Sequence, residues 1–116
     1  MSIYGSLQVP SVTAVDALNA DRATVLLDVR EISEWNAGHA PGASHIPLGN
    51  LSSAASQLPQ DKKIYVICRS GNRSRSATGA LRRAGFDAYN VTGGMQAWAG
   101  AGGRVLNRSN RPGQVV

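Results

Sequence analysis

Five short segments rich in aliphatic and β-branched residues are spread along the chain and predict strands. The clearest is 64–67, where the sequence Ile-Tyr-Val-Ile places four strand-forming residues in a row. Residues 25–27 are also apolar throughout, which is typical of a strand covered on both faces of a sheet. The complete set of predicted strands is 7–9, 25–27, 43–46, 64–67 and 86–91.

Helices are predicted between these strands. Thr13 and Asp16 fit a capping box at the start of a helix whose apolar side is formed by Ala14, Ala17 and Leu18. Further helices are predicted as a short turn capped by Ser33, at 51–58 after a cap at Asn50, at 74–84, and at 95–99 with Trp98 packed inward. The alternation predicts an α/β domain, with a mostly parallel central sheet of about five strands flanked by helices on both faces.

The chain length is that of one domain. With 116 residues, 42% of them apolar and 16% charged, the chain is long enough for one compact core and too short for two. We expect a flexible N-terminus at 1–6, the domain at 7–105, and a flexible tail at 106–116, where Gly, Asn and Arg predominate.

Neither a secretory signal nor a membrane span is apparent in the sequence, so we expect a cytoplasmic protein that does not enter a membrane. The single cysteine, Cys68, excludes an internal disulfide framework. One cysteine and two histidines are also too few for the usual tetrahedral zinc sites, and we expect neither a metal nor another cofactor.

The net charge of +5 raises the question of nucleic-acid binding. We do not expect it, because the seven acidic residues are scattered among the cations and no long Lys/Arg tract exists. Ten of the twelve cations are arginine, which is favoured where anions are held by several planar donors. Three of these, Arg69, Arg73 and Arg75, follow Cys68 within seven residues, and Arg75 is expected on the solvated side of its helix.

Cys68 ends a predicted buried strand and precedes a loop of small and cationic residues that leads into a helix. Gly71 allows this loop to curl, so that successive backbone N–H groups can point at one centre and form an anion site. The helix N-terminus, Arg69 and Arg73 add positive potential, and together these groups favour a thiolate with a depressed pKa. The alternative is an inert buried cysteine, which behaves as a small apolar residue.

At this point the sequence resembles a single-domain rhodanese, a thiosulfate sulfurtransferase. The similarity runs from about residue 9 to 105, and its motifs occur in the order found in that family. The matching segments are Leu27-Asp28-Val29-Arg30 with Glu34-Trp35, Gly38 to Ala43 with His45-Ile46-Pro47, the loop Cys68 to Ser74, and Gly93-Gly94-Met95 with Trp98.

The resemblance implies a rhodanese-like fold and assigns the persulfide-forming role to Cys68. It implies that the anionic donor is bound by the loop that follows, namely Arg69, Ser70, Gly71, Asn72, Arg73 and Ser74. The expected partners are a small anionic sulfur donor such as thiosulfate and a thiophilic acceptor such as cyanide or a thiol, with a sulfur-relay protein as a further candidate. Because no second cysteine is present, the acceptor must come from outside the chain.

Two other functions stay open. Tyrosine-type phosphatases and arsenate reductases also use a cysteine loop, but they require Cys-x5-Arg, whereas Cys68 and Arg73 are separated by four residues. The second alternative is a rhodanese-like module that binds a partner or senses a signal without catalysis. Four further residues lie near the predicted site, and we assign them structural roles: Asp28, Arg30, His39 and His45.

Overall fold

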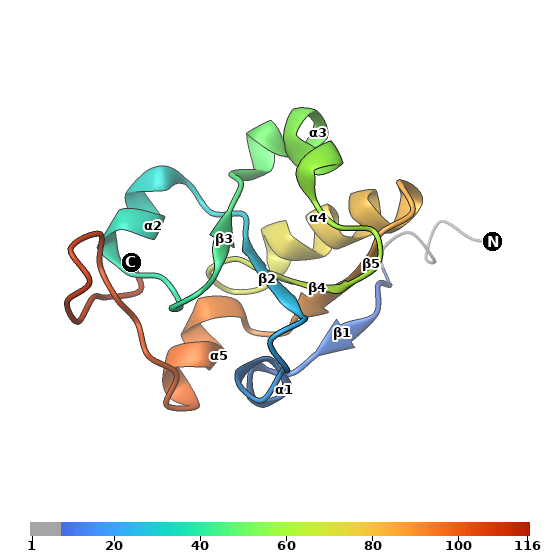
Figure 1. The fold of residues 1–116 in the computed structure, drawn as a ribbon. Coiled ribbons are helices and arrows are strands. Elements are labelled where there is room, and N and C mark those ends of the chain that lie inside the picture. The colour runs from blue at the N-terminus through green and yellow to red at the C-terminus, as the bar shows by residue number, and fades with distance from the viewer. Residues whose placement is uncertain (1–7) are drawn as a thin grey trace.

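A computed structural model describes residues 8–116 of the chain. It contains a single sheet whose five strands are all parallel, in the order β1-β5-β4-β2-β3 (Figure 1). The strands are β1 (Ser11–Val12), β2 (Val25–Asp28), β3 (Ser44–His45), β4 (Lys63–Ile67) and β5 (Asp87–Val91). The prediction of an α/β domain with a mostly parallel sheet is therefore confirmed.

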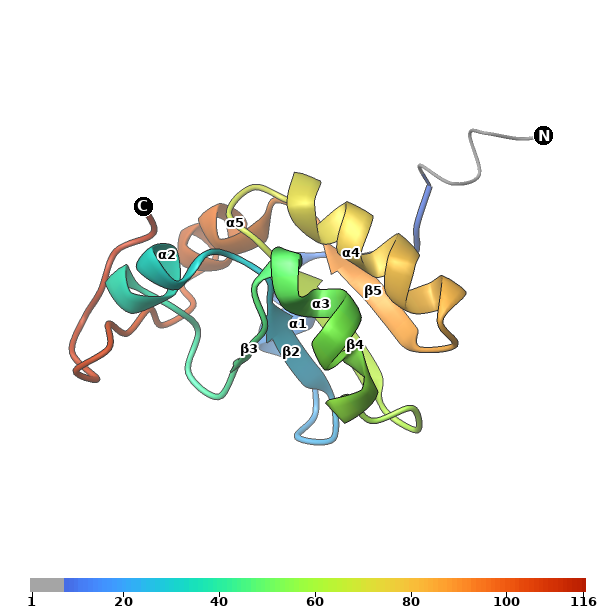
Figure 2. The same cartoon turned by 90° about the horizontal axis from the view of Figure 1, so that it is seen from above.

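Helices cover both faces of this sheet. They are α1 (Ala14–Leu18), α2 (Ile32–Ala37), α3 (Leu51–Ala54), α4 (Asn72–Arg83) and α5 (Gly94–Gly100), with 3₁₀ turns at Leu48–Asn50 and Ala55–Gln57. One core cluster joins α3 and α4 to the sheet, and a second joins α1 and α5 to the opposite face (Figure 1). Helix α2 stands apart, at one end of the domain beside the C-terminal segment (Figure 2).

Strand β4 lies at the centre of the sheet, and its side chains alternate between the two clusters. Ile64, Val66 and then Cys68 face α3 and α4, while Ile67 faces α1 and α5. All four residues are at most 1% exposed, which explains why the strand is apolar on both faces. The alternation also sets the face on which the Cys68 side chain emerges.

The first strand is displaced from its predicted position at 7–9. Leu7 lies outside the described residues, and the pairing with β5 begins only at Ser11. Proline has no N–H to give to a sheet, but the Pro10 carbonyl accepts a hydrogen bond from the Asn90 N–H at 2.9 Å. The ladder therefore starts just after the proline rather than before it.

Two predicted helix starts are also corrected. The capping box of Thr13 and Asp16 is confirmed, with both reciprocal contacts at 3.0 Å. Ser33, by contrast, lies inside α2, which begins after Glu31, and the Glu31 N–H donates to the Glu34 carboxylate at 3.0 Å. Asn50 precedes α3 but makes no capping hydrogen bond through its side chain.

The helix predicted at 51–58 divides into α3 and a 3₁₀ turn, and it ends at Gln57. The boundaries of the other elements agree with the prediction to within two residues. None of the helices in the described part of the chain has the length and apolar character needed to cross a membrane.

The C-terminal segment, expected to be a flexible tail at 106–116, forms several backbone hydrogen bonds with the rest of the domain. Leu106 and His39 exchange two backbone hydrogen bonds, of 2.8 and 2.9 Å, and the Gln114 N–H donates to the Ala37 carbonyl at 2.9 Å. Gly38 permits this approach, because a Cβ at that position would collide with the backbone of Gln114. Val115 packs against the second core cluster. The flexible N-terminus expected at 1–6 lies outside the described residues.

Candidate active site

The predicted loop connects β4 to α4 at the carboxyl edge of the sheet. Gly71 is the residue before α4, and its φ of 108° lies in the left-handed region that favours glycine. A Cβ at this position would lie 3.2 Å from the backbone nitrogen of Gly93, so the turn before α5 limits the space from the other side. The chain therefore bends sharply around Cys68, as expected from the sequence.

The backbone of α5 holds the base of this loop. The Cys68 carbonyl accepts a hydrogen bond from the Met95 N–H at 2.7 Å, and the Arg69 carbonyl accepts one from the Gln96 N–H at 3.0 Å. Gly94 makes the close contact possible, because a Cβ there would collide with the backbone of Cys68 and Arg69. The Gly93-Gly94 segment thus positions the loop.

Two groups that can donate a hydrogen bond lie close to the sulfur of Cys68. The Gly71 N–H is 3.1 Å from Sγ, and the Ser74 hydroxyl oxygen is 3.2 Å from it. The whole cysteine is only 1% exposed, which by itself agrees with an inert buried residue. The two hydrogen bonds do not agree with that alternative, because donors directed at sulfur stabilise a negative charge on it.

Opposing effects act on the ionisation of Cys68. Burial raises the pKa of the thiol, whereas hydrogen bonds from the Ser74 hydroxyl and from the backbone N–H groups of Ser74, Gly71 and Ser70 lower it. The hydrogen bonds prevail, and the pKa of Cys68 lies below its ordinary value. The loop therefore favours the thiolate of Cys68 relative to a cysteine free in water.

Ser74 is buried and has a second close neighbour. Its hydroxyl oxygen lies 2.6 Å from Oδ1 of Asn90, a residue of β5 that is 5% exposed. Thr78 donates its hydroxyl to the Ser74 carbonyl at 2.7 Å and supports the first turns of α4. Sequence reasoning missed Asn90, although one signal was present: it is a polar residue near the end of a strand whose neighbours are apolar.

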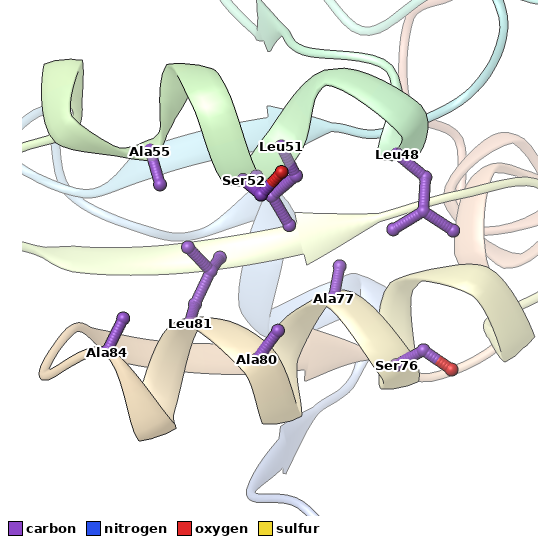
Figure 3. Close-up of a pocket in the computed structure, with 9 residues that line it drawn as sticks. All are labelled: Leu48, Leu51, Ser52, Ala55, Ser76, Ala77, Ala80, Leu81 and Ala84. Carbon is purple, nitrogen blue, oxygen red and sulfur yellow. The ribbon is translucent and has the colours of Figure 1, made fainter.

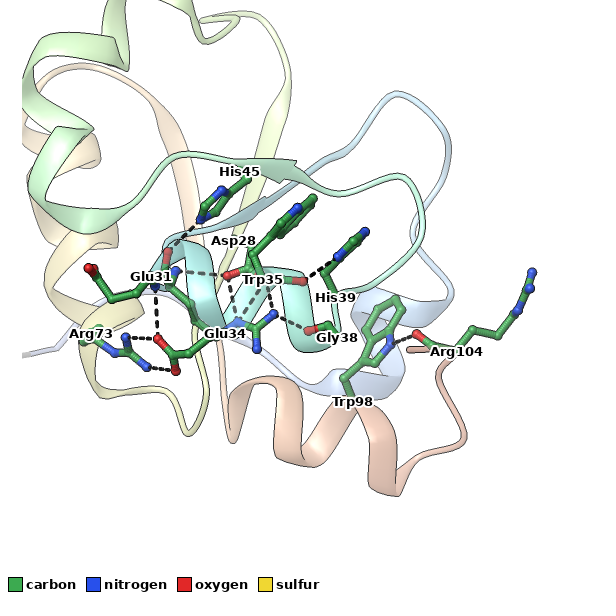
Figure 4. A network of polar contacts seen from close by, with 11 residues as sticks. Asp28, Glu31, Glu34, Trp35, Gly38, His39, His45, Arg73, Trp98 and Arg104 are labelled. Carbon is green, nitrogen blue, oxygen red and sulfur yellow. Dashed lines mark hydrogen bonds and ion pairs between the residues drawn. The ribbon is translucent and has the colours of Figure 1, made fainter. Parts of the chain in front are cut away.

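Arg73 was expected to bind the substrate anion, but its guanidinium is already paired. Two nitrogens of Arg73 donate to the two carboxylate oxygens of Glu34, at 2.7 and 2.8 Å (Figure 4). The hydrogen bond from Arg73 lowers the pKa of Glu34, and the carboxylate raises that of Arg73. In this structure Arg73 joins the start of α4 to α2. A direct contact of Arg73 with the donor stays a prediction.

The other polar loop residues point to solvent. Arg69, Ser70 and Asn72 are exposed, and the Asn72 side-chain oxygen accepts a hydrogen bond from Arg75 at 3.1 Å. Arg75 lies on the solvent side of α4, as expected from the sequence. Among the described residues, Arg69 forms no ion pair with a carboxylate. It is therefore the cation of the loop that remains available to a ligand.

Asp28 and Arg30 form a fully buried ion pair at the end of β2. Arg30 donates to the Asp28 carboxylate at 2.7 Å and to the Gly38 carbonyl at the same distance. His45 contacts the Arg30 carbonyl at 2.7 Å, which ties β3 to this network. The pair therefore orders the segment that leads into α2.

His39 lies against α2. Its Nδ1 is 2.8 Å from the Trp35 carbonyl, and its ring stacks on the Trp35 indole at 3.7 Å. His45 stacks on the same indole at 4.8 Å. None of the residues Asp28, Arg30, His39 and His45 makes a hydrogen bond to the Cys68 sulfur within the described part of the chain.

An apolar groove of about 400 Å³ lies elsewhere, between α3 and α4 (Figure 3). Its lining includes Leu48, Leu51, Ala80 and Leu81 and contains no residue of the loop 68–74. The groove is therefore separate from the loop 68–74, which lies at the carboxyl edge of the sheet.

Comparison with known proteins identifies the family. The sequence profile of the Rhodanese-like domain matches residues 11–101, and the chain belongs to this family. The expected rhodanese-like fold is confirmed by the crystal structure of a rhodanese-related protein from Thermoplasma volcanium, which superposes with a TM-score of 0.80 at 36% identity. That similarity covers 84% of this chain and 98% of the other.

Two relatives from Bacillus subtilis have names that refer to sulfur. YtwF, named as a candidate sulfurtransferase, is 41% identical over 85 residues, which are 73% of this chain and 82% of YtwF. YrkF, named as a candidate sulfur carrier protein, is 42% identical over 84 residues, which are 72% of this chain. The match spans only 45% of YrkF, so more than half of that protein has no counterpart here.

Proposed function

We propose that this protein is a sulfurtransferase that moves sulfane sulfur from a small anionic donor, such as thiosulfate, through a persulfide on Cys68 to cyanide or a thiol. The observation that carries the proposal is the convergence of the Gly71 N–H and the Ser74 hydroxyl on the Cys68 sulfur. Donors placed there stabilise the attacking thiolate. The names of YtwF and YrkF support the same assignment.

In the first half-reaction the Cys68 thiolate attacks the outer sulfur of thiosulfate. A sulfur–sulfur bond forms at Cys68, the sulfur–sulfur bond of thiosulfate breaks, and sulfite leaves with the bonding electron pair. A thiolate and a dianion thereby become a persulfide anion and a sulfite dianion, so charge and electrons balance. Sulfite leaves as a stable anion without a proton, which suits a loop that contains no general acid.

In the second half-reaction an external nucleophile attacks the outer sulfur of the persulfide. Cyanide forms thiocyanate, or a thiolate forms a new persulfide, and the bonding pair returns to Cys68 as thiolate. The enzyme alternates between two stable forms, so ping-pong kinetics follow. The backbone N–H groups of the loop stabilise the anionic persulfide in the interval.

Within this mechanism Arg69 is the cation that attracts the donor, because it is exposed and has no carboxylate partner among the described residues. We place the sulfite portion of thiosulfate beside Arg69 and the backbone N–H groups of Ser70, Gly71 and Asn72. Arg73 acts mainly through its pair with Glu34, which holds the start of α4. The burial of Cys68 favours a small donor over a bulky one.

The phosphatase alternative meets a further obstacle in the structure. A phosphatase benefits from an acid that protonates the leaving alkoxide. Glu34 is the carboxylate that contacts the loop, but Arg73 lowers its pKa, so it holds its proton poorly. Hydrolysis of an aryl phosphate that is lost in Cys68→Ser would nevertheless favour a phosphatase over a sulfurtransferase.

The decisive experiment follows the mass of the protein. Incubation with thiosulfate is expected to add one sulfur atom at Cys68, and later addition of cyanide is expected to remove it and release thiocyanate. Cys68→Ser is the matched control and gains no sulfur. A wild-type protein that gains no sulfur would contradict the proposal and favour a binding or sensing module.

We propose the cytoplasm as the site of action, since a reducing compartment keeps a lone catalytic thiol available. A sulfur-relay protein is the proposed physiological acceptor, and the name of YrkF supports a link to sulfur carriers. Steady-state comparison of several donors and acceptors tests the assignment of the acceptor, and cell fractionation tests the assignment to the cytoplasm.

A further inference from the structure

The Ser74 hydroxyl has one proton and two acceptors within reach. Its oxygen lies 2.6 Å from Oδ1 of Asn90 and 3.2 Å from Sγ of Cys68. A hydroxyl donates a single hydrogen bond, so it cannot serve both acceptors at once. The three side chains are buried, so the hydrogen bonds among them act in a largely apolar surrounding, where they are stronger than in water.

The sheet register places Asn90 at this point. Asn90 pairs with Val66 across β4 and β5, and Val66 and Cys68 project from the same face because side chains alternate along a strand. Ser74, in the first turn of α4, contacts the side chains of Cys68 and Asn90. The contact therefore depends on the strand pairing, and Asn90 lies outside the loop 68–74.

The side-chain amide of Asn90 can face Ser74 in two ways. With Oδ1 toward Ser74, Asn90 accepts the hydroxyl proton and leaves the sulfur without that donor. With Nδ2 toward Ser74, Asn90 donates to the hydroxyl oxygen, and the proton of Ser74 is directed at Cys68. In the described part of the chain the Asn90 side chain has no other hydrogen-bond partner, so no further contact there fixes one orientation.

We propose that Asn90 is a positioning residue whose amide orientation decides whether the Ser74 proton is given to the Cys68 sulfur or withheld from it. In the thiol form, the Cys68 S–H donates a hydrogen bond to the Ser74 oxygen, and the Ser74 hydroxyl donates one to Oδ1 of Asn90. In the thiolate form every donor reverses, so Nδ2 of Asn90 donates to Ser74 and Ser74 donates to sulfur. In both states each of the three side chains keeps a hydrogen-bond partner.

The direct test is NMR of the 15N-labelled protein. The side-chain NH2 resonances of Asn90 are expected to shift with pH at the same midpoint as the alkylation rate of Cys68, since the amide rotates when the thiol ionises. The side chain of Asn72 in the same loop is the control for a simple field effect. In Ser74→Ala the Asn90 response is expected to vanish, whereas an unchanged response would overturn the proposal.

A second test uses the isosteric variant Asn90→Asp, whose carboxylate accepts hydrogen bonds but cannot donate them when ionised. This carboxylate is expected to accept the hydrogen bond of the Ser74 hydroxyl permanently. The alkylation of Cys68 at neutral pH is therefore expected to slow by about tenfold. The same substitution in a Ser74→Ala background is expected to have a clearly smaller effect. Equal slowing in both backgrounds would mean that the new charge acts on its own, which would overturn the proposal.

This inference deepens the proposed function, but its tests do not require sulfur transfer. Alkylation and NMR report the state of Cys68 whether or not thiosulfate reacts. If no sulfur is added while the Asn90 resonances shift at the midpoint of Cys68 ionisation, the sulfurtransferase assignment is contradicted and the positioning role is supported. If loading succeeds while the resonances are invariant, the positioning role falls and the assignment stands.

Discussion

Arg73 and Glu34 face each other in a two-pronged ion pair, with distances of 2.7 and 2.8 Å between their nitrogens and oxygens. The residues are 39 positions apart in the sequence, and the pair joins the first turn of α4 to α2 (Figure 4). A loop arginine that the sequence assigned to substrate is thus engaged with the protein. The loop geometry around Cys68 depends on a helix that contributes no reacting atom.

Arg73→Ala is expected to reduce thiosulfate turnover far more than Arg75→Ala. The first change leaves Glu34, whose side chain is 16% exposed, without its partner and loosens the start of α4. Arg75 is exposed and contacts only Asn72 among the described residues. We expect a loss of about tenfold in kcat/KM for Arg73→Ala and little change for Arg75→Ala. Equal losses would show that the Glu34 pair does not support the site.

The same pair makes stability depend on pH. Because the folded pKa of Glu34 is depressed, its stabilisation is fully present above the unfolded pKa of about 4.3 and is lost as the pH falls through the folded pKa. Urea unfolding is expected to show wild type more stable than Glu34→Gln by about 1 kcal/mol at pH 7, a modest value because the Arg73 side chain is 36% exposed. The difference is expected to narrow below pH 4, and a constant difference would contradict this account.

Alkylation of Cys68 measures the ionisation of the thiol directly. The midpoint of the rate against pH is expected below the free-thiol value of about 8.5, because Gly71 and Ser74 donate to the sulfur. Ser74→Ala removes the hydroxyl donor and is expected to raise the midpoint, while Ser76→Ala on the exposed side of α4 is the control. A wild-type midpoint at or above the free-thiol value would show that burial outweighs the donors.

The Asp28–Arg30 pair is expected to matter for folding. Removing one partner leaves the other charge fully buried without compensation, so Asp28→Asn and Arg30→Met are each expected to lower the free energy of unfolding by about 3–5 kcal/mol. Replacing both residues with apolar ones is expected to recover part of the loss. Chemical unfolding measures each variant, and single variants as stable as wild type would rule out this role.

The C-terminal segment is expected to protect particular amides from hydrogen exchange. The N–H groups of Gly113 and Gln114 donate to the carbonyls of Val105 and Ala37, at 2.9 Å in each case. Both are expected to exchange more slowly than the N–H of Val116, for which no such bond is formed among the described residues. Uniformly fast exchange from residue 106 onward would support a flexible tail instead.

Local chemistry explains what could be predicted. The strand at 64–67 could be predicted from its own apolar residues alone, and the bend after Cys68 from Gly71 and the small residues around it. The capping box of Thr13 is likewise complete within four residues. Such features depend on neighbours in the chain, so residue types and their spacing suffice.

The sequence by itself determined the α/β architecture and the loop that carries Cys68. Only the tertiary structure decided that Arg73 pairs with Glu34, that Asn90 lies beside Ser74, and that the C-terminal segment packs against Gly38. Each of these contacts joins residues far apart in the chain, and each depends on strand register or helix placement. Because a polar or charged side chain has many partners compatible with its chemistry, the partner it takes is set by which surfaces the folded sheet brings together.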